Sequence, residues 1–234
     1  MAFIIILLGI ISCNPIIYGL HFLEREPKYF MCRREVGEAW HDCTRDEVCN
    51  DYGGDRRYYK FVSDVGRDPD YIDNWVQHMD TLCESRVKVG FLGFFYFFGV
   101  VTGLLFAWPL ADIYGKKMVF CGSLFISIIG QSCLIFMAYY TLLGMLFMYF
   151  VGLSWAGKTI IGISYIMDFY PPRMQPLRIF ILDLFDYPSL LLISLSYQYL
   201  DRDWYYQQVV GLVLTILCFL ICFFVIPESP YYLY

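Results

Sequence analysis

Residues 88–110 read KVGFLGFFYFFGVVTGLLFAWPL, and Lys88 is the only charged residue in this stretch. A helix needs about 20 predominantly apolar residues to cross the hydrocarbon core of a bilayer. The stretch therefore predicts a transmembrane helix. Further apolar stretches on both sides predict helices over residues 2–23, 118–139, 141–167, 178–200 and 206–227. The sequence thus predicts an all-α membrane protein with six transmembrane helices, whose backbone polar groups are satisfied within the helices.

The first of these helices has an alternative interpretation as a signal peptide. It lacks a basic n-region and runs long before its polar flank, so we interpret it as a retained helix. The chain then divides into a transmembrane helix over 1–23, an extramembrane loop over 24–87, and transmembrane helices two to six over 88–234.

The composition agrees with this membrane interpretation. Of the 234 residues, 59% are apolar and 17% are charged, against about 45–50% and about 25% in soluble domains. Most charges lie in the loop, and no basic patch indicates nucleic acid as a partner. We find no nucleotide-binding loop, catalytic triad or metal-ligand spacing. The sequence therefore predicts neither an enzyme nor a bound metal or cofactor.

Four of the nine cysteines lie in the loop, namely Cys32, Cys43, Cys49 and Cys83. Four cysteines in one extramembrane segment predict two disulfides in an oxidising compartment, with three alternative pairings. Zinc is the competing interpretation, but the loop has no CxxC or HxxxH spacing to support it.

Lysine and arginine residues in short connections predict the orientation of the helices. Lys116 and Lys117 follow the second helix, and Arg173 and Arg178 follow the fourth. Both basic connections lie on one side, so both termini are expected on the cytoplasmic or matrix side and the loop on the opposite side. The sequence has no Asn-x-Ser/Thr sequon. This favours an organelle membrane, such as the mitochondrial inner membrane, over the plasma membrane.

Three motifs occur in the connections between helices. They are ADIYGKK over 111–117, YIMDFYP over 165–171, and PESP over 227–230, which is followed by Leu233. In type and position they resemble motifs of the major facilitator superfamily, particularly its organic ion transporter and sugar porter branches. The long cysteine-containing loop between helices one and two is also typical of the organic ion branch. The resemblance implies the N-terminal six-helix half of that fold.

The same resemblance implies that Asp112, Gly115, Lys116 and Lys117 are the remnant of a gating motif that locks one closed arrangement. Two departures weaken this motif, because Trp108 replaces its leading glycine and Ile113 replaces its arginine. Related transporters place their substrate between two six-helix halves, and this chain corresponds to one half.

Three ionisable residues, Lys158, Asp183 and Asp186, lie within predicted helices. An unpaired charge inside a bilayer costs at least about 2.5–3.5 kcal/mol. Lys158 and Asp186 lie at similar depth on consecutive helices, so we expect them to pair. The pair would be either a substrate site or a helix-locking contact. A separate interfacial cluster is expected from Asp168, Arg173, Arg178 and Glu228.

These observations lead to two functional hypotheses. The first is a transport-incompetent structural accessory subunit of a larger membrane complex, for example a mitochondrial respiratory assembly. The alternative is a transporter of small organic ions or sugars that works as a dimer or with a separate second half. In both, we expect the bilayer and other membrane protein subunits as partners, with the subunits covering the face of helices one, two, four and five.

Overall fold

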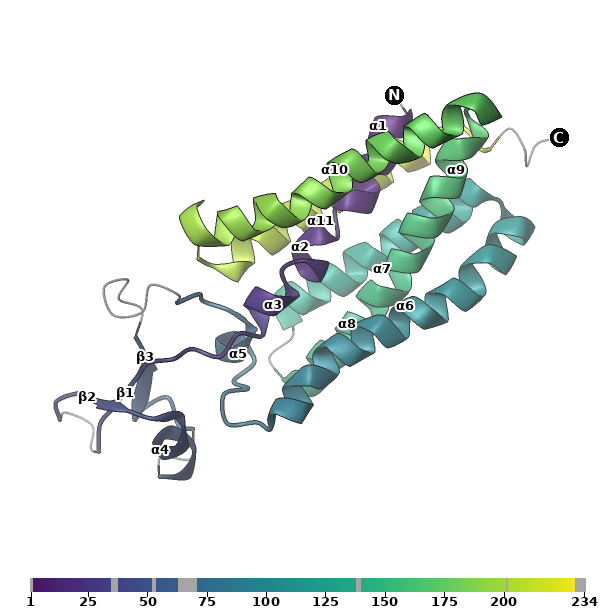
Figure 1. Ribbon diagram of the computed structural model, residues 1–234. Coiled ribbons are helices and arrows are strands. Elements are labelled where there is room, and N and C mark those ends of the chain that lie inside the picture. Colours follow the sequence, from purple (N-terminus) through teal and green to yellow (C-terminus); the bar gives the residue numbers. More distant parts are fainter. Residues whose placement is uncertain are drawn as a thin grey trace.

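The computed structural model describes residues 2–34, 38–51, 54–62, 71–137, 140–200 and 202–229. Within these residues, six helical spans are long and apolar enough to cross a membrane. The six-helix fold predicted from the sequence is confirmed, and the long helices form one elongated bundle (Figure 1). The spans run over Phe3–Leu23, Arg86–Tyr114, Lys116–Phe136, Thr141–Asp168, Pro172–Tyr199 and Trp204–Val225.

The first span is not the continuous helix that its apolar sequence predicts. It consists of three short helices, α1 (Ala2–Ile11), α2 (Asn14–Ile17) and α3 (Leu20–Leu23). Pro15 stands in the first turn of α2 and has no N–H to donate to the preceding turn. Ser12 instead turns its hydroxyl back onto the Gly9 carbonyl oxygen, 2.7 Å away. The chain is therefore interrupted at Ser12 and Cys13, deep in the bundle.

The second and fourth spans pack against each other through glycines. The second span is α6 (Arg86–Tyr114), and the fourth begins as α8 (Thr141–Ala156). A Cβ atom on Gly99 would lie 2.2 Å from the Tyr149 carbonyl oxygen, and one on Gly152 would lie 2.0 Å from that of Tyr96. Two helix backbones approach this closely only where side chains are absent. Glycines thus form the interface between α6 and α8.

Two other spans contain irregular turns. The fourth span continues through a π-helical turn, η1 (Gly157–Ile161), into α9 (Gly162–Asp168). The fifth combines a 3-10 turn, η2 (Pro172–Met174), with α10 (Gln175–Leu195) and a second π-helical turn, η3 (Ser196–Leu200). The third and sixth spans are the regular helices α7 (Lys116–Met137) and α11 (Trp204–Val225).

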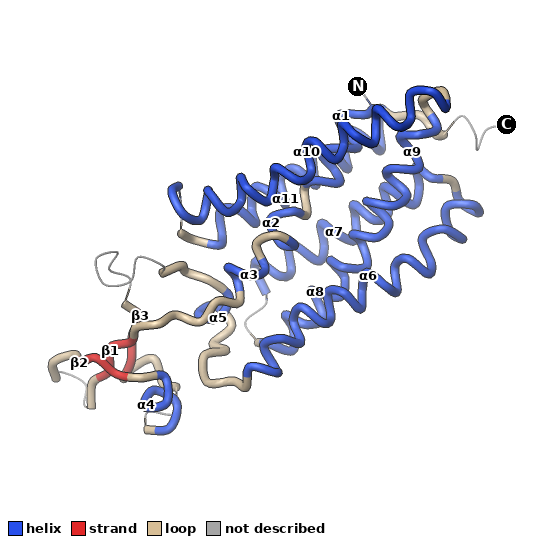
Figure 2. The backbone as a smooth tube through the Cα atoms, viewed as in Figure 1, coloured by secondary structure: helices blue, strands red, loops and turns tan. Residues whose placement is uncertain are grey.

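The loop between the first two spans forms a small unit with its own strands at one end of the bundle (Figure 2). Its antiparallel sheet has the order β2 (His41–Cys43), β1 (Phe30–Cys32), β3 (Tyr59–Phe61). Two short helices complete it, α4 (Arg45–Asn50) and α5 (Trp75–His78). Thr44 and Glu47 cap α4 reciprocally, which satisfies backbone donors at its start. We call this end of the bundle the loop end.

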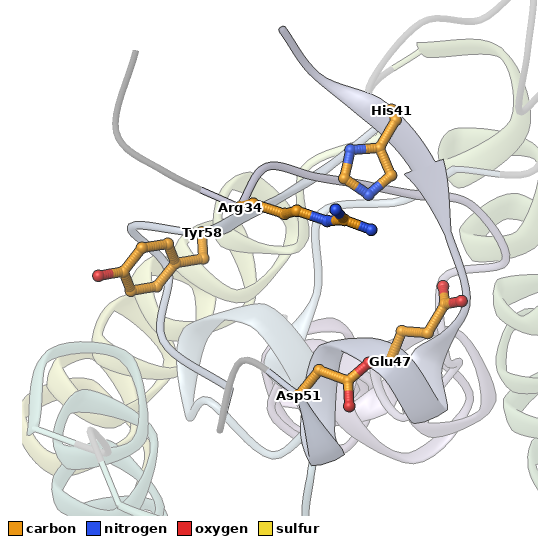
Figure 3. A pocket seen from close by; sticks show the side chains of 5 residues that line it. All are labelled: Arg34, His41, Glu47, Asp51 and Tyr58. Carbon is orange, nitrogen blue, oxygen red and sulfur yellow. The ribbon is translucent and has the colours of Figure 1, made fainter. Parts of the chain in front are cut away.

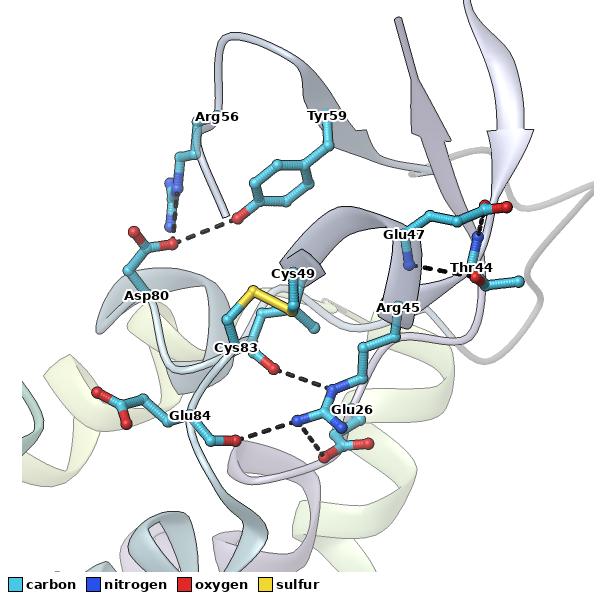
Figure 4. The surroundings of a disulfide bond; sticks show 11 residues. Glu26, Thr44, Arg45, Glu47, Cys49, Arg56, Tyr59, Asp80, Cys83 and Glu84 are labelled. Carbon is cyan, nitrogen blue, oxygen red and sulfur yellow. Dashed lines mark hydrogen bonds and ion pairs between the residues drawn. A yellow bond between two sulfur atoms is a disulfide. The ribbon is translucent and has the colours of Figure 1, made fainter. Parts of the chain in front are cut away.

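The four loop cysteines form two disulfides, Cys32–Cys43 and Cys49–Cys83. The second joins α4 to the segment that leads into α6. Beside it, Arg45 donates hydrogen bonds to the backbone carbonyl oxygens of Leu82 and Glu84, both at 3.0 Å (Figure 4). The disulfide and the arginine therefore fasten α4 to the same piece of chain.

A short segment of the loop also binds to the connection between the fifth and sixth spans. Asp73 forms a parallel β-bridge with Asp203. The Asp73 N–H donates to the Arg202 carbonyl oxygen at 2.9 Å, and the Trp204 N–H donates to the Asp73 carbonyl oxygen at 3.2 Å. Burial, together with the charge of Asp203, raises the pKa of Asp73. The loop is thus attached to the bundle in two ways, through the two spans that it joins and through the connection between the fifth and sixth spans.

Candidate functional site

The side chain of Lys158 is fully buried in the π-helical turn η1, in the middle of the fourth span. Its Nζ lies 2.8 Å from the Ser127 Oγ on α7 and also contacts the Cys13 Sγ at the interruption of the first span. Gln131 donates to both of these neighbours, at 3.0 Å to Ser127 and 3.3 Å to Cys13. Lys158 is therefore held by neutral polar groups from two other spans, the first and the third.

Asp186 on α10 is bound to the residue that follows Cys13. Its carboxylate accepts a hydrogen bond from the Asn14 Nδ2 at 2.9 Å and another from the Tyr18 hydroxyl at 3.2 Å. Asn14 also donates to the Ser189 Oγ at 2.6 Å. The interrupted first span thus presents one polar residue to Lys158 and the next to Asp186.

We call these residues the polar belt, and it crosses the middle of the bundle. Its members are Cys13, Asn14, Tyr18, Ser127, Gln131, Lys158, Asp186 and Ser189. The predicted pairing of Lys158 with Asp186 is wrong, because the first span stands between them and satisfies each separately. Asp183, one turn before Asp186, is half-buried and has no hydrogen bond to another described residue.

The geometry around Lys158 is unusual for a helix interior. A π-helical turn accommodates one extra residue in an α-helix and is frequently found at functional sites. Here it begins at Gly157, where a Cβ atom would lie 1.9 Å from the Ser123 Oγ on α7. Among the described residues, no carboxylate lies within ion-pairing distance of Lys158. A buried ammonium with only dipolar partners is costly to maintain.

A second polar cluster lies at the opposite end of the bundle, which we call the motif end. Lys116 and Asp168 form an ion pair at 2.7 Å, with both side chains largely buried. Asp168 also accepts a hydrogen bond from the Ser229 hydroxyl. These residues come from the three motifs that carry the family resemblance, so the motifs meet in space although they lie far apart in the sequence.

Glu228 closes the same cluster against the turn at Gly115. Its Oε1 accepts from the Lys117 N–H at 2.9 Å and from the Ser229 N–H at 3.2 Å. Gly115 has a φ of +87°, and a Cβ atom there would lie 3.0 Å from the Glu228 carboxyl carbon. Glycine is needed at this position for both reasons. Pro230 and Leu233, the last residues of the third motif, lie outside the described residues.

The remaining predicted residues of the motif end do not join this cluster. The expected grouping of Asp168 with Arg173 and Arg178 is wrong, because Lys116 occupies the carboxylate. Arg178 instead lies over the rings of Tyr170 and Phe3, at 4.3 and 5.5 Å from their centroids. Arg173 is exposed, as is Asp112, and neither has a hydrogen bond or ion pair with another described residue.

The loop contains a cavity of about 640 Å³, lined by Arg34, His41, Glu47, Asp51 and Tyr58 (Figure 3). Arg34 extends into it from one side, Glu47 faces it from α4, and Asp51 lies at the end of that helix. Cationic and acidic side chains balance one another there, so the cavity does not indicate a ligand of one charge. The polar belt is the stronger candidate because Lys158 is fully buried and Asp186 half-buried within the bundle.

Several members of the belt were not predicted from the sequence. Cys13, Asn14, Ser127 and Gln131 were not singled out. The available signal was the run Ser12-Cys13-Asn14-Pro15 within an apolar stretch. Polar residues next to a proline in a transmembrane span indicate a discontinuous helix.

Comparison with known proteins gives two similar solute carriers, while no family model matches the chain. Solute carrier family 22 member 16 of Homo sapiens is 23% identical over 215 residues, which cover 88% of this chain and 37% of that protein. The Mus musculus protein of the same name is 23% identical over 159 residues, which cover 68% of this chain and 24% of that protein. The chain thus spans well under half the length of these relatives. The similarities support a major-facilitator-like relationship to transporters rather than to enzymes.

Proposed function

We propose that this chain is one half of a membrane transporter for small organic ions, completed by a second copy or by a separate second half. The observation that carries the proposal is the polar belt. Lys158 and Asp186 hydrogen-bond to consecutive residues, Cys13 and Asn14, at the interruption of the first span. Transporters characteristically build their binding sites from discontinuous helices near the middle of the bilayer.

In the proposed mechanism, hydrogen bonds within the polar belt are replaced by hydrogen bonds to a solute. An ammonium or other donor group of a solute replaces Asn14 and Tyr18 at the Asp186 carboxylate, and both released side chains belong to the first span. Because that span is interrupted between α1 and α2, its two parts can shift relative to each other. Solute binding at Asp186 would in this way change the contacts of Cys13 and hence those of Lys158.

The second half is proposed to cover the face of spans one, two, four and five. The fifth span is the least buried of the six, and its exposed residues include Phe180, Leu184 and Leu191. Without a partner this surface would face lipid, with Asp183 and Asp186 close by. We also propose that the loop faces an oxidising, non-cytoplasmic side, because of its disulfides. The proposal of an organelle membrane rests on the missing sequon.

Uptake into proteoliposomes that contain the purified chain tests the transporter proposal. A panel of radiolabelled organic cations and anions is compared with and without Asp186→Asn. We expect at least one solute to be taken up above the level of empty liposomes, and Asp186→Asn to reduce its uptake about tenfold, as for one lost charge-assisted hydrogen bond.

Asp183→Asn is the matched control, because it makes the same change on the same helix at a residue without a described hydrogen bond. Equal losses in both variants would contradict the assigned role of Asp186. Lys158→Met is expected to retain the fold, because it removes a buried charge without a carboxylate partner. It is also expected to lower transport.

The accessory-subunit hypothesis remains the alternative, and it rests on the altered gating motif alone. Neither relative supports it, since both are named solute carriers. Its test is the native size of the protein after mild detergent extraction, with mass spectrometry of the co-migrating chains. Absence of uptake together with migration in a large complex would replace the transporter proposal with this one.

A further inference from the structure

A second cavity, of about 610 Å³, lies at the loop end of the bundle. It is formed by the end of the first span, the π-helical turn η3 of the fifth span, and the loop segment before α5. Its lining includes Phe22, Arg25, Tyr71, Ile72, Tyr197 and Arg202. Among the described residues, its lining includes two arginines and no carboxylate, so the cavity is suited to an anion.

The backbones that carry both arginines are fixed by one loop segment. Asn74, which is 1% exposed, donates from its Nδ2 to the carbonyl oxygens of Phe22 at 3.1 Å and Arg25 at 2.6 Å. The neighbouring Asp73 N–H donates to the Arg202 carbonyl oxygen at 2.9 Å. The cavity is therefore a built site, in which two guanidinium groups start from positions set by the fold.

Two buried donors at this cavity have no partner among the described residues. Tyr197 is 2% exposed, and its hydroxyl makes no hydrogen bond with a described residue. The Nη1 atom of Arg202 is likewise buried without a partner in the described part of the chain. Buried donors are normally satisfied, because leaving one unpaired costs more than the bond itself contributes. Asp203, which follows Arg202 in the chain, accepts from the Tyr205 N–H at the start of α11.

We propose that this cavity binds the phosphate group of an anionic amphiphile. The phosphate oxygens accept from Arg202 and Tyr197, while the apolar part lies against Phe22 and Ile72. The site stands where the apolar spans end, at the depth of lipid headgroups, and basic pockets between transmembrane helices bind such headgroups. A membrane phospholipid and a soluble organic phosphate share this chemistry. The site is separate from the polar belt and does not depend on transport.

Native mass spectrometry of the detergent-purified protein tests the proposal with two lipids, phosphatidylglycerol and phosphatidylcholine. We expect phosphatidylglycerol to bind about tenfold more tightly, and Arg202→Gln to remove this preference. Tyr197→Phe should weaken binding several-fold while leaving the ring stacked on Phe22. Arg173→Gln, an equal change at the motif end, is the control and should have no effect. Glycerol 3-phosphate serves as the soluble probe.

Each outcome either identifies the source of the phosphate group or contradicts the proposed site. If glycerol 3-phosphate displaces phosphatidylglycerol in an Arg202-dependent way, the ligand is a soluble phosphate and the chemistry stands. If it does not, while Arg202→Gln loses the lipid preference, the ligand is a headgroup. Equal binding of both lipids, or equal losses in Arg202→Gln and Arg173→Gln, overturns the proposal. If Arg202→Gln lowers the melting temperature, Tyr197→Phe alone decides.

Discussion

Lys158 is held by the Cys13 thiol and the Ser127 hydroxyl rather than by a carboxylate, and the Gln131 amide donates to both of these groups. Such dipoles lower the cost of a buried charge only while all of them keep their orientation. Shifting one neighbour would therefore change the energy of the others. This places Lys158, Cys13 and Ser127 among the residues whose environment changes most if the first span moves.

Glu24, next to the end of the first span, gives a prediction at the same scale. Burial raises the pKa of its carboxyl to about 7, and its Oε1 has no hydrogen-bond partner among the residues that the structure describes. The folded protein therefore binds this proton more tightly than the unfolded chain, whose carboxyl has an ordinary pKa of 4.5. Stability is higher below pH 4.5 and falls as the pH rises from 4.5 to about 7.

We expect Glu24→Gln to remove this contribution to the pH dependence and to raise the melting temperature by a few degrees at pH 7.5. Differential scanning fluorimetry between pH 5 and pH 8 measures both effects. Glu38→Gln, at an exposed carboxylate of the same loop, is the control. A pH profile unchanged by Glu24→Gln would show that its carboxyl is not buried in the folded protein.

At the scale of elements, α6 and α8 depend on backbone contact through glycines. Gly152→Ala would place a methyl group 2.0 Å from the Tyr96 carbonyl oxygen, and neither helix backbone can retreat cheaply. We expect a loss of about 1–3 kcal/mol in the free energy of unfolding, as for other overpacked sites. Thermal melting in detergent measures this loss.

Gly122→Ala is the matched control for that substitution. Gly122 is an exposed residue of α7, and a Cβ atom there would meet nothing within 4 Å. The change should stabilise the helix by up to about 1 kcal/mol, the helix-propensity difference between the two residues. Equal effects of the two substitutions would show that propensity, rather than packing, dominates at Gly152.

The predictability of the elements follows from what creates each of them. Apolar length alone determines a span, so the six helices and the packing glycines of α6 were predictable. The interruption at Cys13 had a local signal in Pro15, whereas the π-helical turn at Lys158 depends on packing against α7. The depth of a charged residue along its helix can be predicted, but the rotation of the helix about its axis determines which residue it contacts. For this reason Asp168 was expected beside arginines and instead binds Lys116.

At the scale of the whole molecule, the loop and the bundle are held by different forces. The loop has a small core, in which Phe30, Val48 and Tyr59 are buried, and two disulfides. The bundle relies on helix packing in the membrane. We therefore expect reduction to unfold the loop while far-ultraviolet circular dichroism of the helices stays nearly constant. Limited proteolysis of the reduced protein should cut within the loop first.

Paired serine substitutions divide this effect between the disulfides. Cys49–Cys83 closes a separation of 34 residues and Cys32–Cys43 one of 11. From loop-closure entropy, we expect the disulfide with the longer separation to stabilise the fold by about 4 kcal/mol and the other by about 3 kcal/mol. The Cys49→Ser/Cys83→Ser variant should thus be the more protease-sensitive. The opposite order would indicate that the sheet, not the α4 attachment, controls loop stability.

The bridge between Asp73 and Asp203 also has a consequence for the order of biosynthesis. Both disulfides lie within the first 83 residues, so the chain needed to close them has been made before the second span is complete. The bridge cannot form until residues 202–204 have been translated, which happens just before the sixth span is made. The loop therefore first exists as a cross-linked unit without its final support. A ribosome stalled before the sixth span would display this immature form, with the segment around Asp73 open to antibodies and proteases.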